Sequence, residues 1–148
     1  MTDHNARYLG QCDRIFVDGT FRTAPHPYYQ MVTIHGLFRT TIVPFCFALL
    51  TDKTVGHYRR IVAHVAGKVR AHHRRRSPPM AICDFEIALV TALQTEHLRT
   101  RVRGCYFHFS QYLWRKVAEL GLVTHYRRNT VNGRGLRRIV QKNERERD

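Results

Sequence analysis

Two aspartates come directly after short apolar stretches, a position from which their carboxylates could bind a metal ion. Asp18 and Asp84 each come after a run predicted to be a strand, and each is followed at once by a break or a helix, in DGTF and DFE. If the two strands are neighbours, both carboxylates meet at one edge of the sheet. Paired carboxylates suit Mg²⁺ or Mn²⁺ and two-metal phosphoryl transfer, and Gly19 would let a phosphate or metal approach the backbone. The alternative is structural, with Asp18 opening a turn and Asp84 capping a helix.

The first fifty residues contain three stretches with strand character. Residues 14–18, 28–35 and 40–50 are rich in β-branched, aromatic and other apolar side chains, and short loops separate them. Pro44 cannot donate to a sheet ladder, so the third stretch is expected at an edge or at a bulge. The pattern predicts an antiparallel meander.

The second half alternates helices and strands. Apolar residues recur at helical spacing over residues 55–69, 86–98 and 109–120, and short apolar runs at 80–83 and 102–107 predict strands between them. The faces expected to point inward consist of Ile87, Val90, Leu93 and His97 or Leu98 in the second helix, and of Phe109, Leu113, Val117 and Leu120 in the third, which Gly121 ends as a C-cap residue.

The full order, β-β-β-α-β-α-β-α, predicts an α/β fold in which a mixed sheet carries helices on its faces. It is the element order of the ribonuclease-H-like fold. A chain of 148 residues suits a single domain, and no apolar run approaches the length of a membrane span. With no export signal and no CxxC pair, we expect reduced thiols and a nuclear or cytoplasmic protein that is not secreted.

Charge favours a polyanionic partner. The sequence carries 25 Lys and Arg against 11 Asp and Glu, a formal net charge of +14, and nucleic acid is the polyanion that this balance most favours. Solvated surface loops are the alternative interpretation of the densest basic clusters. The candidate nucleic-acid contacts are Arg70, Arg74, Arg75, Arg76, Arg127 and Arg128.

Four motifs together resemble a known family. IFVDGTF, TIVPFCFALLTDKTVGHY, ICDFEIALVTAL and GCYFHFSQYLWRKVAELGL, which lie in this order between residues 14 and 126, are similar to the transposase domain of Mutator-like elements (MULE). The resemblance implies a ribonuclease-H-like fold and a metal-dependent DDE-type transposase acting on DNA, either transposon ends or non-specific sites. It implies that Asp18 and Asp84 are the first two catalytic acids and the ligands of Mg²⁺ or Mn²⁺.

The resemblance also implies a third acid, a glutamate on a helix well downstream, for which the sequence offers no match. Glu86 is two residues from Asp84, Glu119 lies in a helix that the family does not use for catalysis, and the remaining acids lie in a polar tail. We therefore expect a truncated, catalytically incomplete domain over residues 14–126, between an N-terminal extension (1–13) and a basic tail (127–148). The alternatives are a domesticated, non-catalytic DNA-binding protein of the same fold and an unstable pseudogene product.

Cys105 and His108 form a C-x-x-H pair, which the MULE family also carries. A structural zinc ion needs four ligands, so the pair alone is incomplete and zinc is not expected. Structural packing is one interpretation of the pair, and contact with a metal or DNA is the other. Trp114 on the following helix is interpreted as a core or interface residue.

Overall fold

The structure, a computed structural model, describes residues 1–20, 24–73, 78–96 and 100–127. The chain divides into two compact units, Met1–Gly104 and Cys105–Asp148. Among the described helices, none has the length and apolar character needed to cross a membrane.

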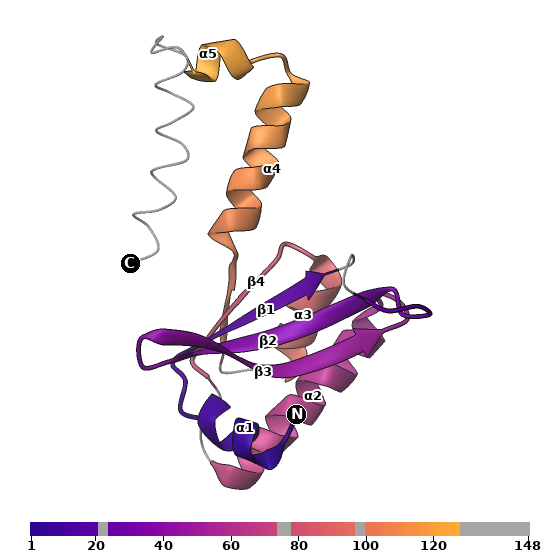
Figure 1. The fold of residues 1–148 in the computed structure, drawn as a ribbon, viewed down its shortest axis with the longest axis vertical. Helices are drawn as coiled ribbons and strands as arrows, with labels where there is room; N and C mark the ends of the chain where they lie inside the picture. The colour runs from indigo at the N-terminus through magenta and orange to yellow at the C-terminus, as the bar shows by residue number, and fades with distance from the viewer. Residues whose placement is uncertain (21–23, 74–77, 97–99, 128–148) are drawn as a thin grey trace. The chain divides into compact units, whose positions relative to one another are not determined.

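The first unit is built on a five-stranded mixed sheet (Figure 1). Its strands are β1 (Arg14–Thr20), β2 (Gln30–Phe38), β3 (Thr41–Leu50), β4 (Met80–Cys83) and β5 (Arg101–Gly104), arranged in the order β3-β2-β1-β4-β5. β1, β2 and β3 pair antiparallel, whereas β4 runs parallel to β1, and β5 parallel to β4. The predicted mixed α/β architecture is confirmed, including the meander.

Proline shapes the outer strand as predicted. β3 is an edge strand, and its register with β2 shifts between Ile34 and His35. Cys46 pairs with Ile34 and Pro44 with His35, which leaves Phe45 between them as the extra residue of a bulge. The missing N–H of Pro44 is thus accommodated at an irregular point of the sheet's edge.

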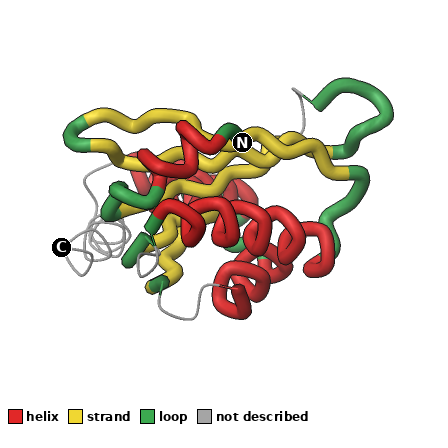
Figure 2. Tube along the Cα trace, turned by 90° about the horizontal axis from the view of Figure 1, so that it is seen from below, coloured by secondary structure: helices red, strands yellow, loops and turns green. Residues whose placement is uncertain are grey.

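Helices cover one face of this sheet. α2 (Val55–His72), the long helix in front of the strands in Figure 2, packs against α3 (Ile87–Glu96). α1 (Asp3–Leu9) packs against α2 and β3, and the Thr2 hydroxyl caps it by accepting a hydrogen bond from the Asn5 N–H at 3.2 Å. The sequence pattern assigned no element to this segment.

The core lies between the sheet and the helices. Alternate strand residues face it, including Ile15 and Val17 of β1 and Ala81 and Cys83 of β4. The side chains that α2 contributes are those of Tyr58, Val62, Val65, Ala66 and Val69.

The inward face expected for α3 was partly wrong. Ile87 is 81% exposed, although Leu93 is buried as predicted, and Val90 packs at the margin of the core. Ile87 precedes the buried Leu89 by two residues, which is about 200° around a helix, so the two cannot share a face. His97 and Leu98 lie outside the described residues. The buried residues of α3 are Leu89, Ala92 and Leu93.

The strand predicted for residues 102–107 is too long. β5 ends at Gly104, and α4 (Tyr106–Glu119) begins two residues later, so Tyr106 and Phe107 are helical. Leu120 is 64% exposed rather than inward, whereas Val117 is buried as expected.

Gly121 ends α4 as predicted. It has a φ of +68°, its N–H donates to the Ala118 carbonyl, and the Leu122 N–H donates to the Val117 carbonyl. This pair of bonds is the Schellman motif, in which glycine is favoured because a Cβ disfavours positive φ. A short helix, α5 (Val123–Arg127), follows.

Candidate catalytic carboxylate site

The sheet brings the two predicted aspartates to adjacent strands. β1 and β4 are neighbours and parallel, with Val17 of β1 paired to Cys83 of β4. Asp18 is the next residue of β1, and Asp84 is the first residue after β4. Both are half-buried. Parallel neighbours in this register place the two residues at the same step along the sheet, as expected for adjacent strands, although β1 continues to Thr20 instead of ending at Asp18 as predicted.

Neither aspartate has the structural role weighed as the alternative. Asp18 does not open a turn, because it lies within β1, pairs with Thr33 and accepts a hydrogen bond from the Thr33 hydroxyl on its carbonyl oxygen at 3.5 Å. Asp84 is not the N-cap of α3, since that helix begins at Ile87. Its Oδ1 instead accepts a 2.7 Å hydrogen bond from the Phe85 N–H, which orients the carboxylate at the end of β4.

Gly19 leaves space for a neighbouring buried side chain. A Cβ built at this position would lie 1.6 Å from Nε2 of Gln30, so the space beside the glycine is filled by that side chain. Gln30 is 1% exposed. On its Cβ side the glycine therefore makes room for a buried amide.

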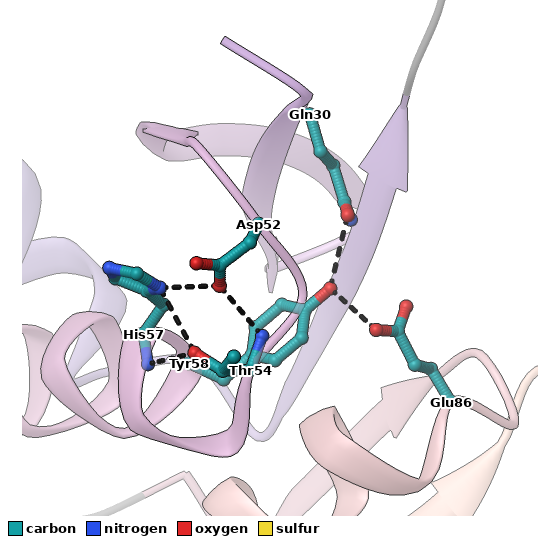
Figure 3. A network of polar contacts seen from close by, with 6 residues as sticks. All are labelled: Gln30, Asp52, Thr54, His57, Tyr58 and Glu86. Atoms are coloured by element: carbon teal, nitrogen blue, oxygen red, sulfur yellow. Dashed lines mark hydrogen bonds and ion pairs between the residues drawn. The ribbon is translucent and has the colours of Figure 1, made fainter.

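A buried tyrosine, Tyr58, links this amide to the carboxylate of Glu86 (Figure 3). The hydroxyl of Tyr58, which is 1% exposed, lies 3.2 Å from Oε1 of Gln30 and 3.0 Å from Oε1 of Glu86. Since a phenol has one hydrogen, the two acceptors share it. Burial raises the pKa of Tyr58, and so do the hydrogen bond to Glu86 and the negative charge of Asp84.

Glu86 is held by this contact from one side and by a lysine from the other. Its Oε2 lies 3.8 Å from Nζ of Lys53, and its side chain is 22% exposed. The sequence pattern treated Tyr58 only as part of an apolar helical stripe and missed its bond to Glu86. The one signal was a residue with a polar tip at a core position, which when buried usually finds a partner.

The donor set suits a divalent cation without making a complete cage. In the part of the chain that the structure describes, no group of three or more His, Cys, Asp or Glu side chains is placed to hold a metal ion. Two carboxylates still match Mg²⁺, which is commonly bound through one or two carboxylates, substrate phosphates and water. Asp18 and Asp84 could therefore hold such an ion together with a phosphodiester.

Comparison with known proteins identifies the family. The model of the MULE transposase domain matches residues 14–112, which is more than half of the chain. The chain belongs to the MULE transposase domain family. No curated protein and no solved structure matches it. Both aspartates of the site, Glu86 and the C-x-x-H pair lie inside the range matched by the MULE domain.

The C-x-x-H pair of the MULE domain lies at the start of a helix. Cys105 occupies the N-cap position of α4, and His108 is the third residue of that helix. The two residues supply two of the four ligands that a structural zinc would need. Trp114 is 39% exposed and packs edge-on against Tyr126, with the ring centroids 5.5 Å apart, so it is not a buried core residue.

The basic residues predicted to contact nucleic acid are described only in part. Arg70 is exposed on α2, and its Nε donates to the Ala66 carbonyl at 3.3 Å. Arg127 is the last residue of α5. The candidates that lie outside the described residues are Arg74, Arg75, Arg76 and Arg128.

A second polar cluster fixes the connection between β3 and α2 (Figure 3). Thr54 caps α2 by accepting from the His57 N–H, and Oδ1 of Asp52 lies 3.0 Å from the Thr54 N and 2.6 Å from Nδ1 of His57. The Thr54 N–H and the His57 ring hold the pKa of Asp52 below its usual value. The cluster was not predicted, although a threonine ahead of an apolar helical pattern is a helix-start signal.

Proposed function

We propose that this MULE domain has the ribonuclease-H-like fold and supports metal-dependent phosphoryl transfer on DNA with Asp18 and Asp84 as the metal-holding acids, at a residual rate because the sequence offers no match for the third acid. The observation that supports this function is the register of β1 and β4, which puts the two acids at one step of two parallel neighbouring strands. We place the catalytic core within residues 14–126.

The residues of the site have separate roles in this reaction. Asp18 and Asp84 supply anionic oxygens, and a bound Mg²⁺ or Mn²⁺ would activate the attacking oxygen and stabilise the leaving oxygen of a phosphodiester. The Phe85 N–H fixes one oxygen of Asp84. The Tyr58 hydroxyl, through its hydrogen bond to Oε1, positions the Glu86 side chain two residues after Asp84. Strand β1 under Asp18 and the Phe85 N–H bond to Asp84 limit the movement of the two acids. Phosphoryl transfer requires this because positioning is most of its catalysis.

The substrate follows from charge as well as family. A net charge of +14 attracts the phosphates of DNA, and each phosphate contact releases counterions, so affinity should fall steeply with salt. We propose that the protein acts on DNA in the nucleus or cytoplasm.

A second candidate function is a DNA-binding protein that keeps this fold without the chemistry. The observation that favours it is the absence, among the described residues, of a third side chain grouped with the two aspartates to hold a metal. Under this function the charge of the chain still attracts DNA, but Asp18 and Asp84 have no catalytic consequence.

A nicking assay with matched variants separates the two functions. Supercoiled plasmid is incubated with Mn²⁺ and the wild type, Asp84→Asn or Asp13→Asn, while affinity for a duplex oligonucleotide is measured at several salt concentrations. Asp13 is an exposed acid directly before β1, so it controls for the loss of one negative charge.

Phosphoryl transfer predicts metal-dependent nicking that Asp84→Asn lowers at least 100-fold and that Asp13→Asn retains. Salt-sensitive DNA binding with no metal-dependent nicking by the wild type would refute it and support the second candidate.

A further inference from the structure

A groove lies between the outer edge of the sheet and α2, away from the carboxylates. It has a volume of about 600 Å³ and is lined by six consecutive residues of β3 and its end, 46–51, by α2, and at one place by Met1 ahead of α1. Side chains of a strand alternate between its two faces. A wall made of consecutive residues therefore presents the edge of the strand, where backbone groups are accessible, and not one of its faces.

Two hydrogen bonds fix which backbone groups point outward. The Leu50 carbonyl accepts from the Tyr29 N–H at 2.8 Å and so faces β2. The Phe45 carbonyl accepts from Nδ2 of Asn5 in α1 at 3.0 Å and so faces away from β2. Because the direction alternates along an antiparallel strand, Phe47 and Leu49 direct their N–H and C=O groups out of the sheet.

Phe47 and Leu49 also leave apolar side chains accessible beside these groups. Phe47 is 60% and Leu49 is 42% exposed. The Cys46 thiol lies 3.9 Å from the Phe47 carbonyl oxygen, and a thiol is a weak donor that a peptide N–H would displace readily. An open strand edge flanked by apolar side chains is a template for another extended chain.

The α2 wall of the groove combines basic and apolar side chains. Arg60 and His64 line the groove with Ile61 between them. Neither Arg60 nor His64 makes a side-chain hydrogen bond or ion pair with any residue that the structure describes. His57 stands at one end, with Nδ1 bound to Asp52. The groove thus offers uncommitted donors to an anionic side chain.

We propose that this groove binds an extended acidic segment of a partner protein, which adds as a sixth strand along β3. Its backbone would pair with Phe47 and Leu49, and side chains on alternate residues would face Arg60 on one side and Phe47 and Leu49 on the other. Another copy of a chain with charge +14 would meet like charge, and DNA has no backbone amides to pair with the strand. The proposal is independent of catalysis.

The probe is a fluorescein-labelled, acetylated and amidated peptide of six alternating Glu and Val residues, and binding to the full chain is followed by fluorescence anisotropy. Leu49→Pro removes an N–H that points away from β2, so no hydrogen bond to β2 is lost. Proline is tolerated at such edge positions. Arg60→Glu reverses the charge in the groove. Arg70→Glu makes the same change on an exposed face of α2 outside the groove lining.

We expect Leu49→Pro and Arg60→Glu each to weaken peptide binding at least 10-fold, and Arg70→Glu to weaken it less than 3-fold. Equal losses in the two arginine variants would mean general charge attraction and would overturn the proposal. An alternating Lys and Val peptide that binds as well as the acidic one would overturn it too.

Peptide variants test the backbone pairing with the protein unchanged, so the test stands even if Leu49→Pro does not fold. Methylating the amide nitrogens of alternate peptide residues blocks pairing only for the residues whose N–H groups face β3. One alternating set should abolish binding and the other should retain it. Retention by both sets, or loss with both, would refute strand addition. Asp84→Asn should bind the peptide as the wild type does, which separates this site from the proposed nuclease site.

Discussion

The phenol that joins Gln30 to Glu86 gives a sharp prediction. Tyr58→Phe removes one oxygen and leaves the ring, so packing in the core is preserved. The variant deletes contacts of 3.2 Å to Gln30 and 3.0 Å to Glu86. Its effect therefore measures the polar network alone.

The expected loss follows from the burial of the two partners. Gln30 is 1% exposed and keeps an acceptor without a donor, which costs about 1–3 kcal/mol. Glu86, with 22% of its side chain exposed, can turn part of its carboxylate to water and loses less. We expect the free energy of unfolding to fall by about 2 kcal/mol, which corresponds to a decrease of about 1 M in the urea midpoint.

Urea unfolding followed by circular dichroism measures this value, with Tyr8→Phe as the matched control. Tyr8 packs edge-on against Phe38 at 5.2 Å, and its hydroxyl makes no hydrogen bond with the described residues. The control should change the unfolding free energy by less than about 0.5 kcal/mol. Equal losses in both variants, or a loss below 0.5 kcal/mol for Tyr58→Phe, would refute the network as a stabilising element.

Further predictions concern pH, backbone space and thiol reactivity. Because the pKa of Tyr58 is raised above its ordinary 10.0, its stabilisation is present below pH 10 and is lost as pH rises above it, so the stability gap to Tyr58→Phe should shrink in alkaline urea titrations. Gly19→Ala should lower the melting temperature, because its Cβ would meet the Gln30 side chain. Gly121→Ala should cost about 1 kcal/mol in chemical unfolding, since φ there is +68°. Cys12 is buried, and burial raises its pKa to about 11, so mass spectrometry should find it alkylated much more slowly at pH 8 than an ordinary cysteine, through both low access and a low thiolate fraction.

The sequence predicted most accurately the elements whose ends are clearly marked by the flanking residues. The strand at residues 80–83 was predicted with its observed limits, because a short apolar run lies between Pro79 and Asp84. The face of α3 was misjudged for the opposite reason. Its sequence IALVTAL is apolar almost all round, so periodicity does not distinguish Ile87 from Leu89, and only packing against the neighbouring elements decides.

Aromatic residues near a boundary misled the strand prediction at β5. Tyr106 and Phe107 have strand propensity, yet they form the first turn of α4, where Cys105 is a weak capping signal. α1 was missed because seven residues carry too little pattern.

The neighbouring placement of the two carboxylates could be predicted because Asp84 directly follows β4 and Asp18 lies near the end of the adjacent strand β1. The Tyr58 bond to Glu86 could not, since it joins residues 28 apart in the sequence and depends on how α2 packs against the neighbouring α3.

The most direct test of shared metal binding is a double-mutant cycle on Asp18 and Asp84. Isothermal titration of Mn²⁺ into the wild type, Asp18→Asn, Asp84→Asn and the double variant gives four affinities under one buffer condition. If both acids hold one ion, each single change lowers affinity at least 10-fold and the double change adds little, because the shared site is already lost. Single variants that bind Mn²⁺ like the wild type, or losses that simply add, would contradict a common metal site.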